Sequence, residues 1–576
     1  VGTPAPGIVG DPLCVWRKVT AERGVALFMH YSGVWDYAAV AKHPEWAAVG
    51  ADGKPSAKAT SVFGPYAREL LVPQLCELAG VYGVDGAWID GECWATVPDY
   101  GERAAKAFRD ATGIQTLPKK PADSHWAEFL QFHREAFRRY LRHYVAEVHK
   151  TNPEFQLCSN WAFTDHMAEP VSAPVDFLSG DYAPDDSVNS ARLSARFLQR
   201  QGLPWDLMAW SFSRKKGPDG KGLQKSAQQL EREAAVVVAL GGGFQAYFTQ
   251  RRDGSVKLEQ MPAMAETARF CRERQALCHR SMPVPQIALL LSTAGHYRKI
   301  NGLFNRDLSG VSGVLQALLE TQNSVEVVSE HQLEGRLGEY PLVVVPEWAY
   351  LEPAFKDDLA AYVKKGGSLL LVGPKSAALF QQELGVTLEG EPAAKPQTLA
   401  FESGQAQTRG FAQAARLGAG AEAFGTLRAE GGAAQPAASV ASLGRGKIAA
   451  VYAELGQSYN GVRSPVVRGF LNALARRLYP RPLVEVAGSS DVDVCLMRQK
   501  GKWLVNLVNT SGPHQTEPIQ EAVLPVGPLS VTLRLPHKPS KLTLEPGGQA
   551  LPFAYRDGEA RLTVQSLDIH RAIVVE

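Results

Sequence analysis

The 576-residue sequence lacks the features that mark membrane-spanning and nucleic-acid-binding proteins. It contains no run of about 18 apolar residues, so no membrane-spanning helix is expected. Its 61 Lys and Arg residues are balanced by 59 Asp and Glu residues, and the net charge is only +2. This balance gives no electrostatic basis for binding nucleic acid or an anionic membrane surface.

Cysteine is scarce and shows no pairing pattern. The seven cysteines are scattered, odd in number and never spaced Cys-x-x-Cys, which argues against a disulfide scaffold and a zinc knuckle. Reduced thiols in a cytoplasmic protein are the expected state. The sequence begins at Val1 without a charged and then apolar leader, so either a segment was removed or the sequence starts inside a longer one.

What the sequence does contain is the pattern of an α/β protein. It is too long for one hydrophobic core, and its residues 1–283 alternate short apolar runs with amphipathic stretches, as βα units do. Strands are expected at Val25–Tyr31, Val84–Asp90, Phe155–Asn160, Val175–Gly180, Leu207–Trp210 and Phe244–Phe248. Helices are expected at Pro65–Tyr82, His125–Lys150, Val188–Gln201 and Leu223–Leu240.

Each of these expected strands ends in polar or aromatic residues. The ends are His30-Tyr31-Ser32, Asp90, Asn160-Trp161, Asp181-Tyr182, Trp210-Ser211 and Tyr247-Phe248-Thr249. In a parallel α/β barrel, the C-terminal ends of the strands carry the catalytic groups. Six such ends predict a (β/α)8-type TIM barrel with one shared catalytic face over residues 1–283.

The remaining chain has two other patterns. Residues 284–482 hold short β-rich runs with helices between them, typical of a flavodoxin-like or amidotransferase-like α/β domain. No G-x-G-x-x-G or Gly-x-Cys-x-Gly motif accompanies these strands, so the fold is expected without that chemistry. Residues 483–576 alternate apolar and polar residues between turns, which predicts a small C-terminal β-sandwich.

The most informative stretch is the strand that ends at Asp90. Carboxylates beside indole rings at a strand end are typical of sites that cleave glycosidic bonds. Hydrolysis of such a bond with retention needs a carboxylate nucleophile and a second carboxyl group about 5–5.5 Å away. A strand end can hold Asp90 rigidly for the first role, and Trp88 lies on the same face two residues earlier. Glu92 is a second carboxylate, for catalysis or for binding sugar hydroxyls. The alternative is that Asp90 caps the following helix or pairs with an arginine.

A second acidic stretch follows the expected strand Val175–Gly180. Asp185 or Asp186 in this loop would reach across the mouth of the barrel as the partner carboxyl. The alternative reading is turn chemistry, because Pro-Asp-Asp-Ser is a favourable turn and helix N-cap sequence.

Other residues have the chemistry to bind a sugar, since aromatic rings pack on its apolar faces and polar side chains bind its hydroxyls. The candidates are His30, Trp35, Glu45, Trp46, Asn160 and Trp161. Each candidate also has an interpretation without sugar binding. Glu45 and Trp46 would lie in an ordinary surface loop with Trp46 packed inward. Asn160 and Trp161 would belong to the core with their hydrogen bonds satisfied, and His30 faces either the barrel lumen or the helices.

The segment Leu70–Gly91 resembles the signature of the α-L-fucosidases. It holds a PQL-x-EL helix, a Tyr-Gly turn and a strand that ends Trp-x-Asp-Gly. In that family the Asp of this motif is the nucleophile, so the resemblance implies this role for Asp90. The loop Gly180–Asp186 is similar to the family's acid/base loop, with Asp181 beside its aromatic residue and Asp186 in the position of the catalytic Glu.

The segment that follows extends the likeness. Leu203–Phe212, which includes Trp210, resembles the family's next segment, and the whole architecture resembles glycoside hydrolase families 29 and 151. Two departures stand out. Asp186 is one methylene shorter than Glu, which keeps Asp185, Glu92 and Glu45 as alternative acid/base groups. The family's first two barrel strands have no counterpart, so the barrel lacks two βα units or an upstream segment is missing.

The resemblance implies a retaining exo-glycosidase that hydrolyses terminal fucosyl linkages of an oligosaccharide or glycoside. It implies no metal and no organic cofactor, and it implies a homo-oligomer through the middle domain. Two alternatives stay open: a β-galactosidase-like glycosidase, and a non-catalytic carbohydrate-binding or assembly relative. β-Galactosidases of similar build use Asn-Glu after the fourth strand, where this chain has Asp-Gly-Glu.

Overall fold

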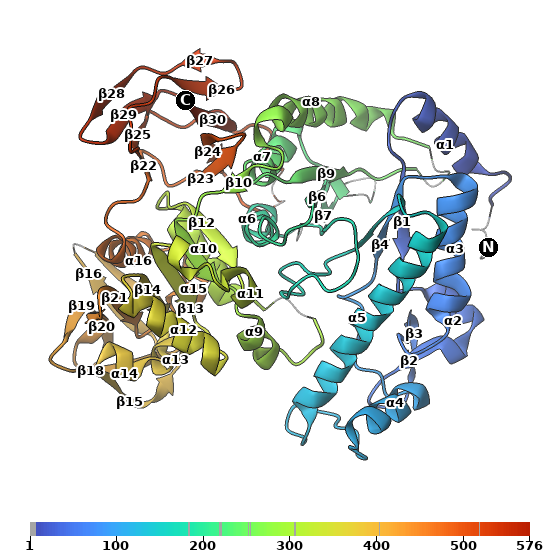
Figure 1. Ribbon diagram of the computed structural model, residues 1–576, viewed down its shortest axis with the longest axis horizontal. Coiled ribbons are helices and arrows are strands. Elements are labelled where there is room, and N and C mark those ends of the chain that lie inside the picture. The colour runs from blue at the N-terminus through green and yellow to red at the C-terminus, as the bar shows by residue number, and fades with distance from the viewer. Residues whose placement is uncertain are drawn as a thin grey trace. The chain divides into compact units, whose positions relative to one another are not determined.

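The computed structural model describes residues 7–182, 185–217, 220, 222–251, 253, 255–304, 307–402, 404–515, 517 and 519–576 (Figure 1). The chain divides into two compact units. The first comprises Val1–Gly180, Leu203–Trp205 and Tyr297–Asp307. The second comprises Asp181–Gly202, Asp206–His296 and Leu308–Glu576. All seven cysteines are free thiols, as their scatter predicts.

The centre of the first unit is a three-stranded parallel sheet. Its order is β1 (Phe28–Ser32), β4 (Gly86–Asp90) and β5 (Gln156–Ser159), and β4 lies in the middle. Ser32 is in register with Asp90, so the C-terminal ends of these strands meet at one edge. Ala87 and Ile89 are fully buried, as expected for a strand with both faces covered.

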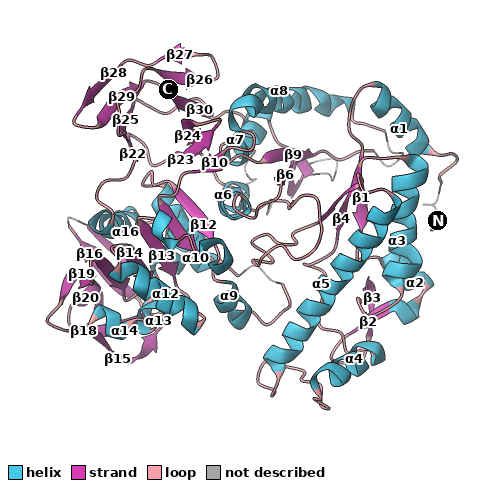
Figure 2. Cartoon of the chain, viewed as in Figure 1, coloured by secondary structure: helices cyan, strands magenta, loops and turns pink. Residues whose placement is uncertain are grey.

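The other regular elements of this unit are mainly helices (Figure 2). The helix expected before β4 runs from residue 67 to residue 82, with π-helical turns flanking α3. α5 (Trp126–Thr151) buries an apolar face that includes Phe137, Leu141 and Tyr144. The other elements are α1 (Pro12–Glu22), α2 (Tyr37–Lys42), η1 (Pro44–Trp46), β2 (Ala47–Val49), β3 (Pro55–Thr60), η2 (Ala67–Leu71), α3 (Val72–Cys76), η3 (Glu77–Tyr82) and α4 (Glu102–Thr112).

The strand expected at Val175–Gly180 is wrong. Within the first unit, this segment forms only an isolated bridge between Leu178 and Trp205. The reason is that the Asp176 side chain takes the place of a backbone carbonyl in the hydrogen bonding to β5. The carboxylate of Asp176 accepts the N–H of Leu157 at 2.7 Å, while its own N–H donates to the Leu157 carbonyl. Val175 and Leu178 are buried without regular strand pairing.

One part of the first unit comes from far along the chain. The guanidinium of Arg134 on α5 donates to the carbonyls of Leu303 and Gly302 at 2.8 and 3.0 Å, and it lies 4.1 Å from the ring of Tyr297. The hydroxyl of Tyr297 donates to Glu169 at 2.5 Å. The segment Tyr297–Asp307 therefore belongs to the first unit, although the expected domain boundary lies at residue 283.

In the second unit, β6 (Asp206–Trp210) and β9 (Gly243–Tyr247) form a two-stranded parallel sheet. The neighbouring elements are α6 (Ser187–Leu198), β7 (Phe212–Lys216), β8 (Gly222–Gln224), α7 (Ala227–Val238), η4 (Leu258–Gln260) and α8 (Met261–Cys278). The mixed α/β class is confirmed. Within the described ranges, the parallel strands of residues 1–283 form two separate sheets, β1-β4-β5 and β6-β9. A (β/α)8 barrel, with or without its first two βα units, therefore stays a prediction.

The second unit also holds a nine-stranded sheet with the order β12-β11-β13-β14-β21-β20-β19-β16-β17. Five parallel strands form one part of it: β11 (Ile287–Leu290), β12 (Val325–Val328), β13 (Leu342–Pro346), β14 (Ser368–Val372) and β21 (Gly446–Val451). Antiparallel strands extend it: β16 (Gln397–Phe401), β17 (Gly404–Thr408), β19 (Ala421–Ala429) and β20 (Gln435–Leu443). β15 (Val386–Ala393) and β18 (Ala412–Leu417) form a separate pair.

The helices that accompany this sheet are α10 (Ser309–Leu319), α11 (Glu330–Leu333), η5 (Leu337–Glu339), α12 (Pro353–Lys364), α13 (Pro374–Ala378), α14 (Gln381–Leu384), α15 (Leu455–Val462) and α16 (Pro465–Leu478). α9 (Thr293–Lys299) leads into the segment that joins the first unit. The parallel strands β11 and β13 are fully buried apolar runs, as the sequence pattern of a doubly wound sheet predicts.

The C-terminal part consists of strands and loops (Figure 2). One sheet contains β10 (Met282–Pro283), β23 (Val492–Gln499), β24 (Lys502–Asn509), β30 (His570–Val575), β26 (Leu542–Glu545) and β27 (Gln549–Ala550). The other contains β22 (Val484–Ala487), β25 (Leu529–Arg534), β29 (Glu559–Val564) and β28 (Phe553–Arg556). Their alternating apolar residues share one core that includes Val494, Val505 and Val531. The division into domains 1–283, 284–482 and 483–576 stays a prediction.

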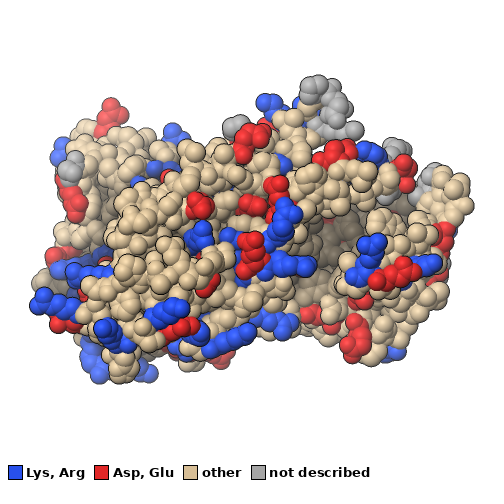
Figure 3. Space-filling model, turned by 90° about the horizontal axis from the view of Figure 1, so that it is seen from above, with Lys and Arg blue, Asp and Glu red and all other residues tan. Residues whose placement is uncertain are grey.

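The surface has no dominant sign of charge on the face seen in Figure 3, where acidic and basic side chains are interspersed. This matches the near-zero net charge of the sequence. Among the described helices, none combines the length and the apolar character needed to span a membrane.

Candidate active site

Asp90 lies at the C-terminal end of the central strand β4, and its two oxygens have different surroundings. Oδ1 accepts three hydrogen bonds, from Gly91 N at 2.7 Å, Asn160 Nδ2 at 2.9 Å and Trp94 Nε1 at 3.1 Å. Oδ2 faces His30 Nε2 at 3.4 Å. The side chain is 35% exposed, so one oxygen is held firmly and the other still has accepting capacity toward solvent.

These contacts fix the charge of Asp90. Partial burial would raise the pKa of its carboxyl group, but hydrogen bonds from His30, Asn160, Gly91 and Trp94 outweigh burial and lower the pKa to about 2. Hydrogen bonds to the charged form stabilise the carboxylate. Asp90 is therefore ionised throughout the neutral range, as a nucleophile must be.

Aromatic rings flank this carboxylate. Trp94 is 42% exposed, and its ring centroid lies 5.5 Å from that of Trp35. On the other side, His30 packs against Trp88 at 5.1 Å, as their pairing in register on β1 and β4 requires. An exposed indole beside a carboxylate provides an apolar platform and a reactive group in one place.

The backbone around these residues adopts uncommon conformations. Gly91 has a φ of 63°, and a Cβ there would lie 2.4 Å from the Cβ of Trp35. In the loop after β5, Trp161 and Phe163 have φ values of 66° and 59°. Non-glycine residues with positive φ are costly and concentrate at functional sites. Trp161 itself is 6% exposed and stacks on His166, so the structure places it in the core.

Three other candidates of the first unit lie in different surroundings. Glu92, two residues after Asp90, has no exposed surface. Trp46 is 5% exposed and stacks on His43, with 3.9 Å between the ring centroids. This is the inward packing that the sequence offered as the alternative to sugar binding. The Glu45 side chain is 62% exposed and pairs with His43 at 3.3 Å. A role in substrate binding stays a prediction for each of them.

The remaining candidates belong to the second unit. Trp210 donates its indole N–H to Asp181 at 3.0 Å, across the bridge between Asp181 and Met208. Asp186 is the N-cap residue of α6, and its two oxygens accept from Asn189 Nδ2 at 3.0 and 3.2 Å. Asp185 pairs with Arg214 on the surface. Residues 183–184 of the predicted acid/base loop lie outside the described residues.

Trp94 is a further candidate for the site that the residues predicted from the sequence leave out. It is an exposed tryptophan, four residues after Asp90, and its indole N–H donates to the Asp90 carboxylate. Its sequence signal was available, because an aromatic residue in the loop after a barrel strand lies on the catalytic side.

Asn160→Ala is expected to raise the pKa of Asp90, because it removes one of three donors to Oδ1. The titration midpoint of the Asp90 carboxyl group should move up by about one pH unit. A ¹³C NMR titration of this carboxyl group measures the change. The exposed Asn301→Ala is the matched control, and an unchanged midpoint in Asn160→Ala would contradict this account of the charge.

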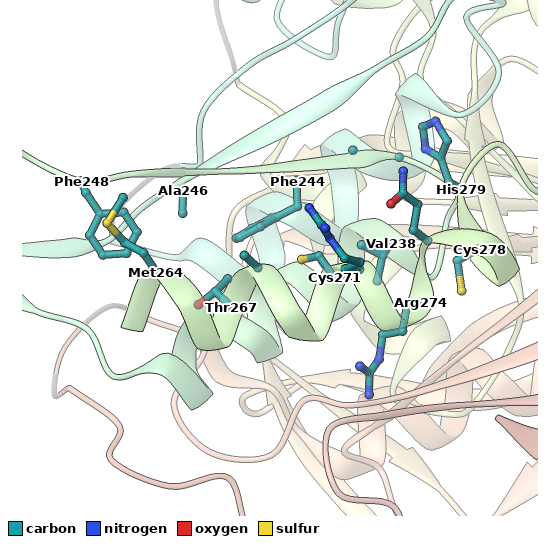
Figure 4. A pocket seen from close by; sticks show the side chains of 15 residues that line it. Val238, Phe244, Ala246, Phe248, Met264, Thr267, Cys271, Arg274, Cys278 and His279 are labelled. Atoms are coloured by element: carbon teal, nitrogen blue, oxygen red, sulfur yellow. The ribbon is translucent and has the colours of Figure 1, made fainter. Parts of the chain in front are cut away.

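An apolar groove of about 440 Å³ lies elsewhere, between β9 and α8 of the second unit (Figure 4). Phe244, Ala246 and Phe248 form one wall, and Met264 and Cys271 stand on the opposite one. None of the described residues that line it is an Asp or Glu. The groove therefore offers no carboxylate for acid/base chemistry, and the ends of β1, β4 and β5 remain the candidate active site.

Comparisons with known proteins give matches in structure. A scan against protein-family models finds no match, and neither does a search of curated proteins. The α-L-fucosidase isoenzyme 2 from Paenibacillus thiaminolyticus matches with a TM-score of 0.83 and 18% identity, over 99% of this chain and 90% of that chain. A GH42 β-galactosidase from G. stearothermophilus matches with a TM-score of 0.71 and 13% identity, over 99% and 91%. A β-galactosidase from Bacillus circulans sp. alkalophilus gives 0.68 and 13%, over 98% and 91%. The chain therefore has a fold found in glycoside hydrolases.

Proposed function

We propose that the protein is a retaining exo-glycosidase that releases terminal α-L-fucose, with Asp90 as its nucleophile. The observation that carries this proposal is the ionised Asp90 carboxylate at a strand end, with one oxygen held by three donors and an exposed tryptophan beside it. The fold shared with an α-L-fucosidase supports it. The same fold occurs in β-galactosidases, so the choice of sugar rests on the Trp-x-Asp-Gly motif around Asp90.

In this proposal Oδ2 makes the attack, because Oδ1 already accepts three hydrogen bonds. Oδ2 forms a bond to the anomeric carbon while the glycosidic C–O bond breaks and the leaving oxygen takes a proton from the acid. Oδ1 stays bonded to Gly91, Asn160 and Trp94, which orients the carboxylate during the attack. Water then attacks the same carbon, the base takes its proton, and Asp90 leaves as a free carboxylate.

The acid and base is a second carboxyl group, and the resemblance assigns it to Asp186. Asn189 holds both of its oxygens at the start of α6, which restricts the rotamers of this short side chain. Asp185 and Glu45 remain alternatives because both side chains are largely exposed. The complete burial of Glu92 argues against its contact with a substrate.

A panel of aryl glycosides tests the proposal. We expect release of nitrophenol from 4-nitrophenyl α-L-fucoside, and ¹H NMR should detect the α anomer of fucose as the first product because configuration is retained. Turnover of the β-D-galactoside instead would favour the galactosidase alternative. Thermal stabilisation by fucose without turnover of any glycoside would favour a binding protein, and either outcome overturns the fucosidase proposal.

A further inference from the structure

Glu92 is a buried carboxyl group on the same turn as Asp90. It has no exposed surface, although it follows the partly exposed Asp90 by only two residues. Apart from burial, the largest influences on it among the described residues come from Ser159, Tyr144, Val34 and Asp90, and none of these groups is a cation. A buried carboxylate without a cation is costly, so such a group keeps its proton.

The contacts of Glu92 join separate elements of the first unit. Its Oε2 accepts from Ser159 Oγ of β5 at 3.0 Å and from Tyr144 Oη of α5 at 3.2 Å. Its Oε1 occupies the space beside Gly33, where a Cβ would lie only 1.9 Å away. Gly33 in turn donates its N–H to the carbonyl of Asp90 at 2.7 Å. Glu92 therefore connects the ends of β1, β4 and β5 with helix α5.

The two carboxyl groups of this turn hold opposite protonation states. Burial raises the pKa of Glu92 to about 8, against hydrogen bonds from Ser159, Tyr144 and Val34 that lower it, while the nearby charge of Asp90 raises it further. The pKa of Asp90 is about 2. At neutral pH the turn therefore carries one negative charge, and that charge is on the group exposed to solvent.

We propose that Glu92 is a positioning residue for Asp90: a neutral carboxyl group that fixes the turn presenting the nucleophile without placing a second negative charge behind it. This inference rests on the proposed function of Asp90. It assigns Glu92 a role through the turn and not through contact with the sugar.

Among the carboxyl, phenol and thiol groups around this turn, Glu92 is the one with a pKa near 8. The imidazole of His30 also faces Asp90, at 3.4 Å. The titratable groups that face Glu92 are Tyr66, Tyr140 and Tyr144, with Cys93 and Asp90 beside it. Burial raises the pKa of each tyrosine and of the Cys93 thiol well above the ordinary value, so these groups stay protonated. Asp90 is already ionised.

The decisive variant is Glu92→Gln, which preserves the shape and cannot ionise. We expect kcat of the unsubstituted protein to fall as the pH rises through about 8, while Glu92→Gln keeps most of its activity at pH 7 and keeps only the part of the alkaline limb that the acid/base carboxyl sets. Glu92→Ala should lower kcat by about 10- to 100-fold with little change in KM, because the nucleophile is displaced. Glu102→Gln, on the exposed surface of α4, is the matched control.

A second measurement does not depend on activity. The folded protein keeps the Glu92 proton up to about pH 8, whereas the unfolded chain releases it near the ordinary value of 4.5. Stability should therefore fall as the pH rises between these values, and the fall in Tm should be smaller in Glu92→Gln. Identical alkaline limbs and identical Tm profiles would overturn the inference. Absence of turnover in every protein, with the Tm difference intact, would instead count against the proposed function.

Discussion

Asp90→Asn is expected to lower kcat on an aryl α-L-fucoside by roughly 10⁴-fold or more, because an amide cannot form the covalent intermediate. Asn has the same shape as Asp, and its one carbonyl oxygen can still accept from Asn160, Gly91 and Trp94. The loss should therefore lie in the chemical step. Steady-state kinetics give the change in kcat, and thermal stabilisation by fucose reports whether the sugar still binds.

Chemical rescue sharpens this test. Asp90→Gly removes the carboxylate, and added azide should restore part of the turnover of a substrate with a good leaving group by attacking the anomeric carbon itself. Asp110→Asn on the surface of α4 is the matched control, since its partner Lys106 is an exposed neighbour on the same helix. Near-normal turnover by Asp90→Asn would remove Asp90 from the mechanism.

The second large effect concerns the stability of the second unit. Asp493 on β23 binds Arg192 of α6 through both oxygens, at 2.7 and 3.0 Å, and lies 3.6 Å from Arg196. The three side chains are no more than 2% exposed. Asp493→Asn leaves two buried guanidinium groups without this charge, so we expect a loss of about 3–5 kcal/mol in the free energy of unfolding.

Urea unfolding followed by circular dichroism measures this loss as a lower transition midpoint. The control is Asp557→Asn, which breaks an ion pair with Arg556 in which both side chains are at least 85% exposed. Its effect should stay within about 0.5 kcal/mol. Equal midpoints for the two variants would show that the buried pair adds nothing to stability.

Sequence patterns predicted the strands and helices of this protein where the apolar pattern of the segment alone decides its secondary structure. The strand expected at Val84–Asp90 differs from β4 by two residues at one end, and the helix expected at His125–Lys150 differs from α5 by one at each end. The apolar run Val175–Gly180 failed as a strand because Asp176 bonds through its side chain to β5. A local pattern does not reveal whether a side chain will take over a backbone hydrogen bond.

The candidate site was predictable to a similar degree. A carboxylate at the end of a buried strand identified Asp90, and the same reasoning placed His30 and Asn160 beside it. The burial of Glu92 was not predictable, because it depends on Tyr144, which lies 52 residues away in sequence, and on the absence of a side chain at Gly33. Contacts of this kind depend on tertiary packing, which sequence periodicity does not predict.

The segment Tyr297–Asp307 has a consequence for how this protein can be divided. The chain passes between the two units at residues 180, 202, 205, 296 and 307, so no single cut separates them. A polypeptide ending at residue 283 would leave the buried guanidinium of Arg134 without the carbonyls of Gly302 and Leu303. The units are therefore not modules that recombination could exchange as continuous gene segments, and a change in the sequence of one is constrained by residues encoded far away.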